Sequence, residues 1–171
     1  VGALALADAK RLLDAADVVC ALTLDALAGT DAAFDPAVHE ARPHPGQGET
    51  ASRLRSLLRA SEIRESHRYG DPRVQDSYSI RCIPQVHGAA RDVMGYVRRI
   101  LETEANSTTD NPLVLPDAGV VLSAGNFHAQ VVAQALDFLA IIDNLSSLGG
   151  VSPRIDFNVV VFPAPFAPAI P

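Results

Sequence analysis

The sequence predicts a mainly α-helical fold, a bundle of long helices with one small β-hairpin. Three observations support this prediction. Apolar residues recur at steps of three and four through several long segments, which is the period of an amphipathic helix. A run rich in Pro and Gly separates the first two of these segments. Farther along, two short apolar runs flank a Pro-Asp-Ala-Gly turn, which is typical of a hairpin.

The first half of the chain is expected to hold one long helix and two shorter ones. Residues 1–28 are rich in Ala and Leu, and residues 29–48 form a loop with one short helix at 36–41, where Pro36 suits the first helical position. Residues 50–60 form a second amphipathic segment, with Leu54, Leu57 and Leu58 on one side. The predicted apolar stripe of the first helix comprises Leu4, Asp8, Leu12, Ala16 and Val19, widened by Leu13 and Cys20.

The second half adds two long helices around the hairpin. Residues 61–82 are polar and irregular, and a helix is expected from Pro84 to about Ala105. The hairpin pairs residues 114–115 with 120–122, and the last helix is expected over 126–148, ended by two glycines. We expect residues 1–150 to form one helical unit. Residues 151–171, rich in Pro, Val and Ala, form an atypical tail.

Composition and charge exclude several classes of function. The chain carries 14 Lys and Arg against 20 Asp and Glu, a net charge of -6. Nucleic acid is therefore not an expected partner, because its phosphates require a basic surface. No run reaches the ~20 apolar residues that cross a bilayer, so no membrane association is expected. Two cysteines without a CxxC pair favour a reducing cytoplasm as the location.

The most informative stretch for chemistry is residues 75–82, which read QDSYSIRC. Gln75, Tyr78 and Arg81 recur at steps of three, which in a tight helical turn places an amide, a phenol and a guanidinium on one side. The guanidinium offers a fork suited to a carboxylate. The alternative interpretation is a loop whose polar side chains cap the helix that begins at Pro84.

Two further stretches carry clustered polar groups. Residues 104–112 hold more hydrogen-bonding side chains than a turn requires, although turns favour Asn, Asp, Ser and Thr. Residues 123–128 lie at the N-terminus of the last predicted helix, where free N–H groups attract an anion, or where Ser123 or Asn126 is an ordinary cap. The five histidines have no paired spacing, so no metal site is assigned.

Taken in order, these stretches resemble the histidine ammonia-lyases of the aromatic amino acid ammonia-lyase family. Residues 75–86 are similar to the family's QDxYSxRCxPQ segment, residues 104–113 to its EANxxxDNPL turn, and residues 124–129 to its GGNFHA helix start. The segments at 42–47 and 61–67 are similar as well. The resemblance runs from residue 1 to about 150, and with no initiator Met at Val1 we interpret the chain as an internal part of a longer subunit.

The resemblance implies a chemistry and its partners. These lyases remove ammonia from an aromatic amino acid without oxidation, and for histidine the product is urocanate. Their electrophile is a 4-methylideneimidazole-5-one group made from an internal Ala-Ser-Gly, and they form homotetramers whose active sites draw on several subunits. No Ala-Ser-Gly occurs in these 171 residues, so the group is expected to come from outside this segment, and the chain alone to be inactive.

By the same resemblance, five residues are candidates for the site. Arg81 would pair with the substrate carboxylate, and Tyr78 would sit at the reacting carbon or assist proton transfer. Gln75 and Asn111 would hydrogen-bond the substrate or the electrophile, and Phe127 would pack beside the prosthetic ring. Asn126 and His128 are weaker candidates, because a cap and a buried histidine also explain them.

Two alternatives to histidine ammonia-lyase stay open. One is a lyase or aminomutase that acts on phenylalanine or tyrosine, although the stretches Arg81-Cys82 and Asn126-Phe127-His128 fit the histidine branch better. The other is a catalytically inactive helical fragment, whose apolar stripes need partners. Ala124 stands where the family usually has Gly, and Gln130 where it usually has Glu. We interpret residues 151–171 as foreign to the family.

Overall fold

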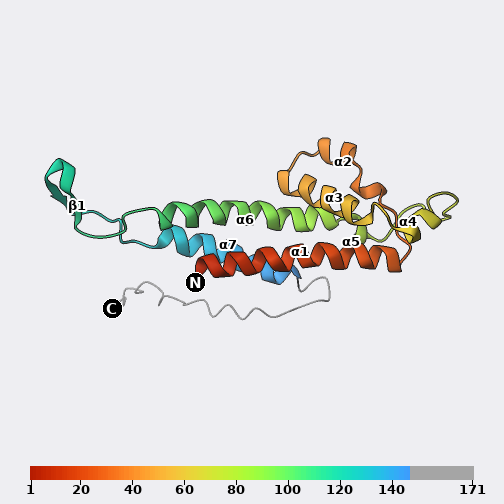
Figure 1. Ribbon diagram of the computed structural model, residues 1–171, viewed down its shortest axis with the longest axis horizontal. Coiled ribbons are helices and arrows are strands. Elements are labelled where there is room, and N and C mark those ends of the chain that lie inside the picture. Colours follow the sequence, from red (N-terminus) through yellow and green to blue (C-terminus); the bar gives the residue numbers. More distant parts are fainter. Residues whose placement is uncertain (147–171) are drawn as a thin grey trace, which may run out of the picture.

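A computed structural model describes residues 1–146, which form a bundle of long helices with shorter helices packed at one end (Figure 1). The chain runs along α1 (Gly2–Ala26), returns along α6 (Ile83–Ala105) and turns back along α7 (Gln130–Ser146). The shorter elements are η1 (Ala32–Phe34), α2 (Pro36–Glu40), α3 (Pro45–Leu58), α4 (Glu62–Ser66) and α5 (Tyr78–Arg81). The predicted mainly α fold is confirmed.

The hairpin lies at the far end of α6 from these shorter helices (Figure 1). β1 (Leu113–Leu115) pairs antiparallel with β2 (Val120–Leu122), in the register Leu113 to Leu122. The turn uses η2 (Pro116–Ala118) and then Gly119, whose φ of 65° suits a residue without a Cβ. This hairpin confirms the sequence prediction.

The start of α2 follows the sequence signals, and the start of α3 does not. Asp35 precedes Pro36 and accepts the N–H of Ala37 at 2.9 Å, so α2 begins with a side-chain cap and a proline at its first position. The prediction that α3 begins at residue 50 is wrong, because the helix already starts at Pro45. Its early turn contains glycines, but Asp92 of α6 accepts the N–H of Gly46 at 2.8 Å and so stabilises it.

Two apolar clusters form the core. The first joins α1, α6 and α7, and the second joins α1 to η1, α3, α5 and the start of α6. Phe34, Leu24 and Leu54 in the second cluster are fully buried. The first cluster consists of Ala9, Leu13, Ala90, Met94, Val97, Ala135 and Leu139, and the second of Ala21, Leu24, Phe34, Ala51, Leu54, Leu58, Ile80 and Ile83.

The predicted stripe of α1 is wrong in its orientation. The buried face consists of Ala9, Leu13, Asp17, Ala21 and Leu24, so only Leu13 of the predicted set belongs to it. Leu4 and Val19 are instead exposed, at 72% and 41%. The prediction took apolar side chains as the sign of the buried face. It failed because this face carries Asp17, whose charge is satisfied by arginines of other helices.

Other boundaries also differ from the predictions. Residues 61–82 are not wholly irregular, since they include α4 and α5. Leu57, expected on the apolar side of its helix, is 45% exposed. The helix expected from residue 126 begins at Gln130. The predicted glycine stop at 149–150 and the tail at 151–171 lie outside the described residues.

Helices α3 and α6 approach each other at a pair of glycines. A Cβ built on Gly88 would lie 2.4 Å from the backbone nitrogen of Gln47, and a Cβ on Gly46 would lie 2.2 Å from the carbonyl oxygen of Gly88. Neither backbone atom can move aside without moving its helix. The two glycines therefore permit a close crossing that places the start of α6 against α3.

Candidate functional site

The residues Gln75, Tyr78 and Arg81 lie on one short segment at the end of the bundle where α1 stops. Gln75 is exposed in the loop before α5, Tyr78 is the first residue of α5 with 76% exposure, and Arg81 is its last residue, half-buried. The capping alternative is not supported, because neither α5 nor α6 has a side-chain hydrogen bond at its N-cap. The polar groups of this segment are thus not consumed by helix ends.

Arg81 is held from one side only. Its Nε donates to the carbonyl oxygen of Asp76 at 3.1 Å. Among the side chains that the structure describes, up to residue 140, none makes a hydrogen bond or ion pair with its two terminal nitrogens. A guanidinium held in this way presents its terminal nitrogens as a fork, the geometry that matches a carboxylate.

Asn111 and Phe127 lie at the other end of α6, around the hairpin. The Oδ1 of Asn111 accepts the N–H of Ala124 at 2.8 Å and the hydroxyl of Ser123 at 3.1 Å. This leaves the Nδ2 group of Asn111 as the donor for a ligand. Phe127 is 62% exposed, so its ring has an open face for a planar group.

The weaker candidates prove to have other surroundings. Residues 123–128 form the turn before α7 and not its first turn, so neither Ser123 nor Asn126 caps that helix. His128 is exposed, which contradicts a buried histidine. Its Nδ1 accepts the N–H of Gln130 at 3.2 Å and so caps the start of α7.

The five candidate residues do not meet within one chain. Tyr78 and Arg81 precede α6, and Asn111 and Phe127 follow it (Figure 1). Because α6 has 23 residues, its ends are separated by about 34 Å. One end of α6 therefore presents three of the predicted residues, and the other end presents two.

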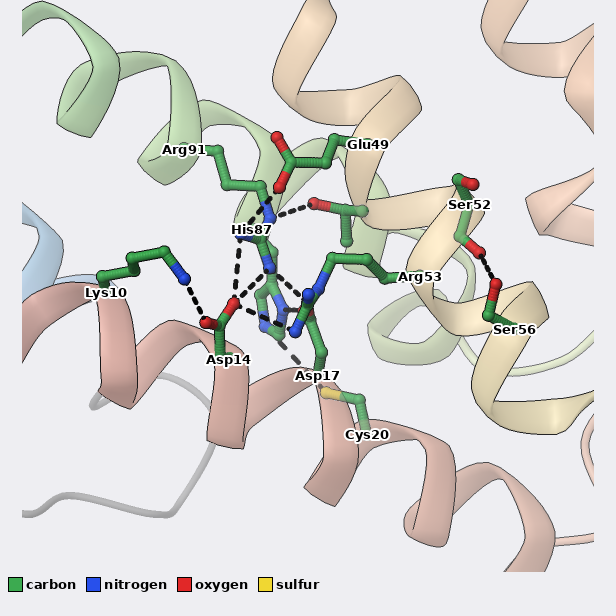
Figure 2. A network of polar contacts seen from close by, with 11 residues as sticks. Lys10, Asp14, Asp17, Cys20, Glu49, Ser52, Arg53, Ser56, His87 and Arg91 are labelled. Atoms are coloured by element: carbon green, nitrogen blue, oxygen red, sulfur yellow. Dashed lines mark hydrogen bonds and ion pairs between the residues drawn. The ribbon is translucent and has the colours of Figure 1, made fainter.

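A buried polar cluster joins α1, α3 and α6, and sequence reasoning missed it (Figure 2). Asp17 of α1 is fully buried and accepts Nε of Arg53 at 2.7 Å and Nδ1 of His87 at 2.8 Å. Arg91 of α6 also pairs with Asp17, and it lies 3.3 Å from Asp14. His87 and Arg91, four residues apart on the apolar side of a predicted helix, were the available signal for such a cluster.

The cluster shifts the pKa of its members. Burial opposes ionisation of Asp17, but hydrogen bonds from His87 and Arg53 and the charge of Arg91 outweigh it and hold the pKa below its usual value. Burial likewise disfavours the His87 imidazolium, yet the hydrogen bond to Asp17 and the contact with Cys20 raise the pKa of His87 to about 9. Both groups are therefore charged near neutral pH, and they fix the start of α6 that follows Arg81.

The described residues contain neither a metal-binding cluster nor a membrane span. Within residues 1–146 no group of three or more His, Cys, Asp and Glu side chains could hold a metal ion. Among the helices so described, none is long and apolar enough to cross a bilayer. Cys20 and Cys82 are free thiols.

Comparison with known proteins adds the family to this geometry. The family described as aromatic amino acid lyase matches residues 1–154. The histidine ammonia-lyase of Koribacter versatilis is 53% identical over 166 residues, which cover 90% of this chain and 32% of that protein. The human histidine ammonia-lyase is 49% identical over 158 residues, which cover 90% of this chain and 24% of that protein.

Solved structures show the same fold. The histidine ammonia-lyase of Trypanosoma cruzi matches with a TM-score of 0.73 and 43% identity, covering 86% of this chain and 27% of that one. The tyrosine aminomutase of Streptomyces globisporus matches with a TM-score of 0.77 and 34% identity, covering 86% of this chain and 31% of that one.

The fold is thus that of the helical aromatic ammonia-lyases. The chain belongs to the aromatic amino acid lyase family. It spans about a third or less of the length of the curated relatives it matches. In the aligned part, the two histidine ammonia-lyases named above share about half of its residues.

Proposed function

We propose that this chain works as part of a histidine ammonia-lyase subunit, which converts L-histidine to urocanate and ammonia without oxidation. The observation that carries the proposal is Arg81, whose terminal nitrogens form an open fork on the short helix that also carries the exposed phenol of Tyr78, within a segment that reads QDSYSIRC. The identity to relatives named histidine ammonia-lyase supports histidine as the substrate.

The chemistry needs three contributions, and this chain offers two of them. Arg81 binds the substrate carboxylate, and Gln75 adds a hydrogen bond to the same ligand. Tyr78 moves a proton at the carbon next to the leaving ammonium. The third contribution is the 4-methylideneimidazole-5-one group, which supplies an electrophile that takes up electrons when it is present.

Asn111 and Phe127 suit the surroundings of that prosthetic group. The free Nδ2 of Asn111 donates a hydrogen bond to a carbonyl oxygen, and the exposed ring of Phe127 packs against a planar ring. The 171 residues contain no Ala-Ser-Gly, so the group is formed by other residues of the subunit. The chain by itself is therefore inactive.

Separation of the two halves supports an oligomeric site. Because the ends of α6 lie too far apart for Arg81 and Phe127 to touch one small substrate, their partners come from other copies in a cytoplasmic homotetramer. The exposed apolar side chains along α1, including Leu4, Val19 and Leu22, are consistent with such contacts.

A second candidate is an aminomutase or lyase acting on tyrosine or phenylalanine, favoured by the match to tyrosine aminomutase. The full-length protein separates these candidates when it is supplied with L-histidine, L-tyrosine and L-phenylalanine. We expect urocanate, followed by its ultraviolet absorbance, and a severe loss of it in Arg81→Ala. Unchanged kinetics in Arg81→Ala would overturn the carboxylate assignment, and a β-amino acid or a coumarate product would favour the second candidate.

A further inference from the structure

Asp76 joins the segment that carries Arg81 to the loop that follows α1. Its side chain is 3% exposed, and its Oδ2 accepts the backbone N–H of Thr30 at 2.6 Å. Its Oδ1 lies 3.3 Å from the guanidinium of Arg73. A buried carboxylate bound by a backbone N–H and a cation is firmly fixed, because both interactions are charge-assisted.

The loop that receives Asp76 is itself well held. Arg73 donates to the carbonyl oxygens of Leu27 and Ala28, and Nε2 of His67 lies 2.9 Å from the carbonyl oxygen of Gly29. Thr30, whose backbone N–H binds Asp76, is the next residue of the chain after Gly29. The carboxylate of Asp76 is therefore anchored to a surface that several side chains restrain.

The same residue holds Arg81 through its backbone. The carbonyl oxygen of Asp76 accepts Nε of Arg81 at 3.1 Å, so the peptide fixed by the carboxylate also fixes the guanidinium. With Nε engaged, Arg81 can offer a substrate carboxylate only its two terminal nitrogens. The orientation of this fork then depends on where the Asp76 peptide lies.

We propose that Asp76 is a positioning residue for Arg81, which sets the guanidinium so that its terminal nitrogens meet the carboxylate of the substrate. This inference rests on the proposed function. Asp76 is buried and acts through Arg81, so it does not touch the substrate itself. A purely structural anchor would support the whole segment, and its loss would weaken every ligand equally.

A ligand without a carboxylate separates positioning from simple anchoring. Histamine is histidine without its carboxylate, so its binding does not use the fork of Arg81. In the full-length protein, we expect Asp76→Asn to raise KM for histidine about tenfold and to leave kcat within about threefold. The inhibition constant of histamine should change less than about twofold.

The matched control is Asp35→Asn. Asp35 also accepts a backbone N–H, that of Ala37, but it caps α2 and has no contact with Arg81. This variant should leave the KM for histidine unchanged. Where Asp76→Asn fails to fold, Asp76→Glu keeps the charge and displaces the peptide by one methylene, and it should show the same selective loss for histidine.

A double-mutant cycle gives the second readout. In an Arg81→Ala background, Asp76→Asn should change KM by less than about twofold, because the group that it positions is gone. Equal losses for histidine and histamine, or additive effects with Arg81→Ala, would overturn the positioning role. A wild-type protein that neither binds nor deaminates histidine would instead overturn the proposed function, and this inference with it.

Discussion

Asp17 shows how a single charge can organise three helices. It is fully buried, yet it is bound by Arg53 of α3 and by His87 and Arg91 of α6 (Figure 2). Removing one member of such a cluster is more costly than replacing all of them by apolar side chains, because the remaining charges stay buried without partners. The site segment before α6 therefore depends on ionic contacts that begin six residues beyond Arg81.

His87 gives this cluster a dependence on pH. Its pKa is raised from 6.5 to about 9 in the folded chain, so the folded state keeps a proton that the unfolded state releases. The stabilisation is fully present below pH 6.5 and is lost as the pH rises through about 9. We expect the Tm of the full-length protein to fall over this window, with a loss on the order of 3 kcal/mol from His87.

Two variants test the origin of that loss. His87→Gln should lower Tm at pH 7 and flatten its decline at alkaline pH, because the titrating group is absent. His44→Gln removes an exposed histidine and should keep the wild-type profile. A decline that persists unchanged in His87→Gln would assign the pH dependence to other groups.

Tyr78 is expected to act on the chemical step and not on substrate binding. Tyr78→Phe removes the hydroxyl and keeps the ring, which is 76% exposed in this chain and makes no side-chain hydrogen bond among the described residues. General acid–base groups contribute roughly 10²- to 10⁴-fold, so kcat should fall by about that factor while KM stays within about threefold. Steady-state kinetics on histidine measure both, and a change confined to KM would contradict the assignment.

The site could be predicted only as separate residues. The spacing of three indicated Gln75, Tyr78 and Arg81, and the family resemblance added Asn111 and Phe127; each of the five is exposed or half-buried in the fold. The helix expected at 84–105 already placed them on either side of one long element, but the exposure of each side chain could not be read from local patterns, since it depends on tertiary structure. The capping role of His128 was also missed, because α7 begins at Gln130, about one turn later than the helix start predicted at residue 126.

At the scale of elements, the crossing of α3 and α6 makes a firm prediction. A Cβ at Gly88 would lie 2.4 and 2.5 Å from the backbone N and Cα of Gln47, so the two helices must separate. Gly88→Ala should therefore destabilise the fold by about 1–3 kcal/mol or more, as overpacking does. Chemical denaturation of the full-length protein measures the difference.

The matched control lies on the same helix. A methyl group added at Gly95 of α6 would have only the end of the Arg99 side chain near it, at 4.0 Å. Gly95→Ala should be neutral or stabilise by up to about 1 kcal/mol, because Ala is the better helix former. Equal stability of the two variants would show that the crossing is not constrained by Gly88.

Helices and strands could be predicted where the apolar period was strong. The prediction failed where polar side chains hold the helices together. The helix expected at 84–105 begins one residue early and ends as predicted, and the hairpin strands agree within one residue. The start of α3 was missed because Gly46 is stabilised by Asp92, 46 residues away. The face of α1 was misassigned because Asp17 is buried among partners on other helices.

At the scale of the whole molecule, the separation of the half-sites predicts complementation between subunits. Arg81→Ala and Phe127→Ala damage opposite ends of α6, so each variant alone should be nearly inactive. When both full-length variants are expressed together, some sites draw an intact Arg81 from one copy and an intact Phe127 from another. With random mixing of two contributing copies, about a quarter of the sites should be intact.

To measure this, the two variants are co-expressed with a distinct tag on each, and the mixed oligomer is purified by means of these tags. Histidine deamination should rise from near zero to about a quarter of the wild-type rate. Mixing Arg81→Ala with a second variant of the same half, Tyr78→Phe, is the control, because both lesions then lie at one end of α6. If that pair recovers as much activity as the first, or if the first recovers none, the two ends of α6 do not serve one shared site.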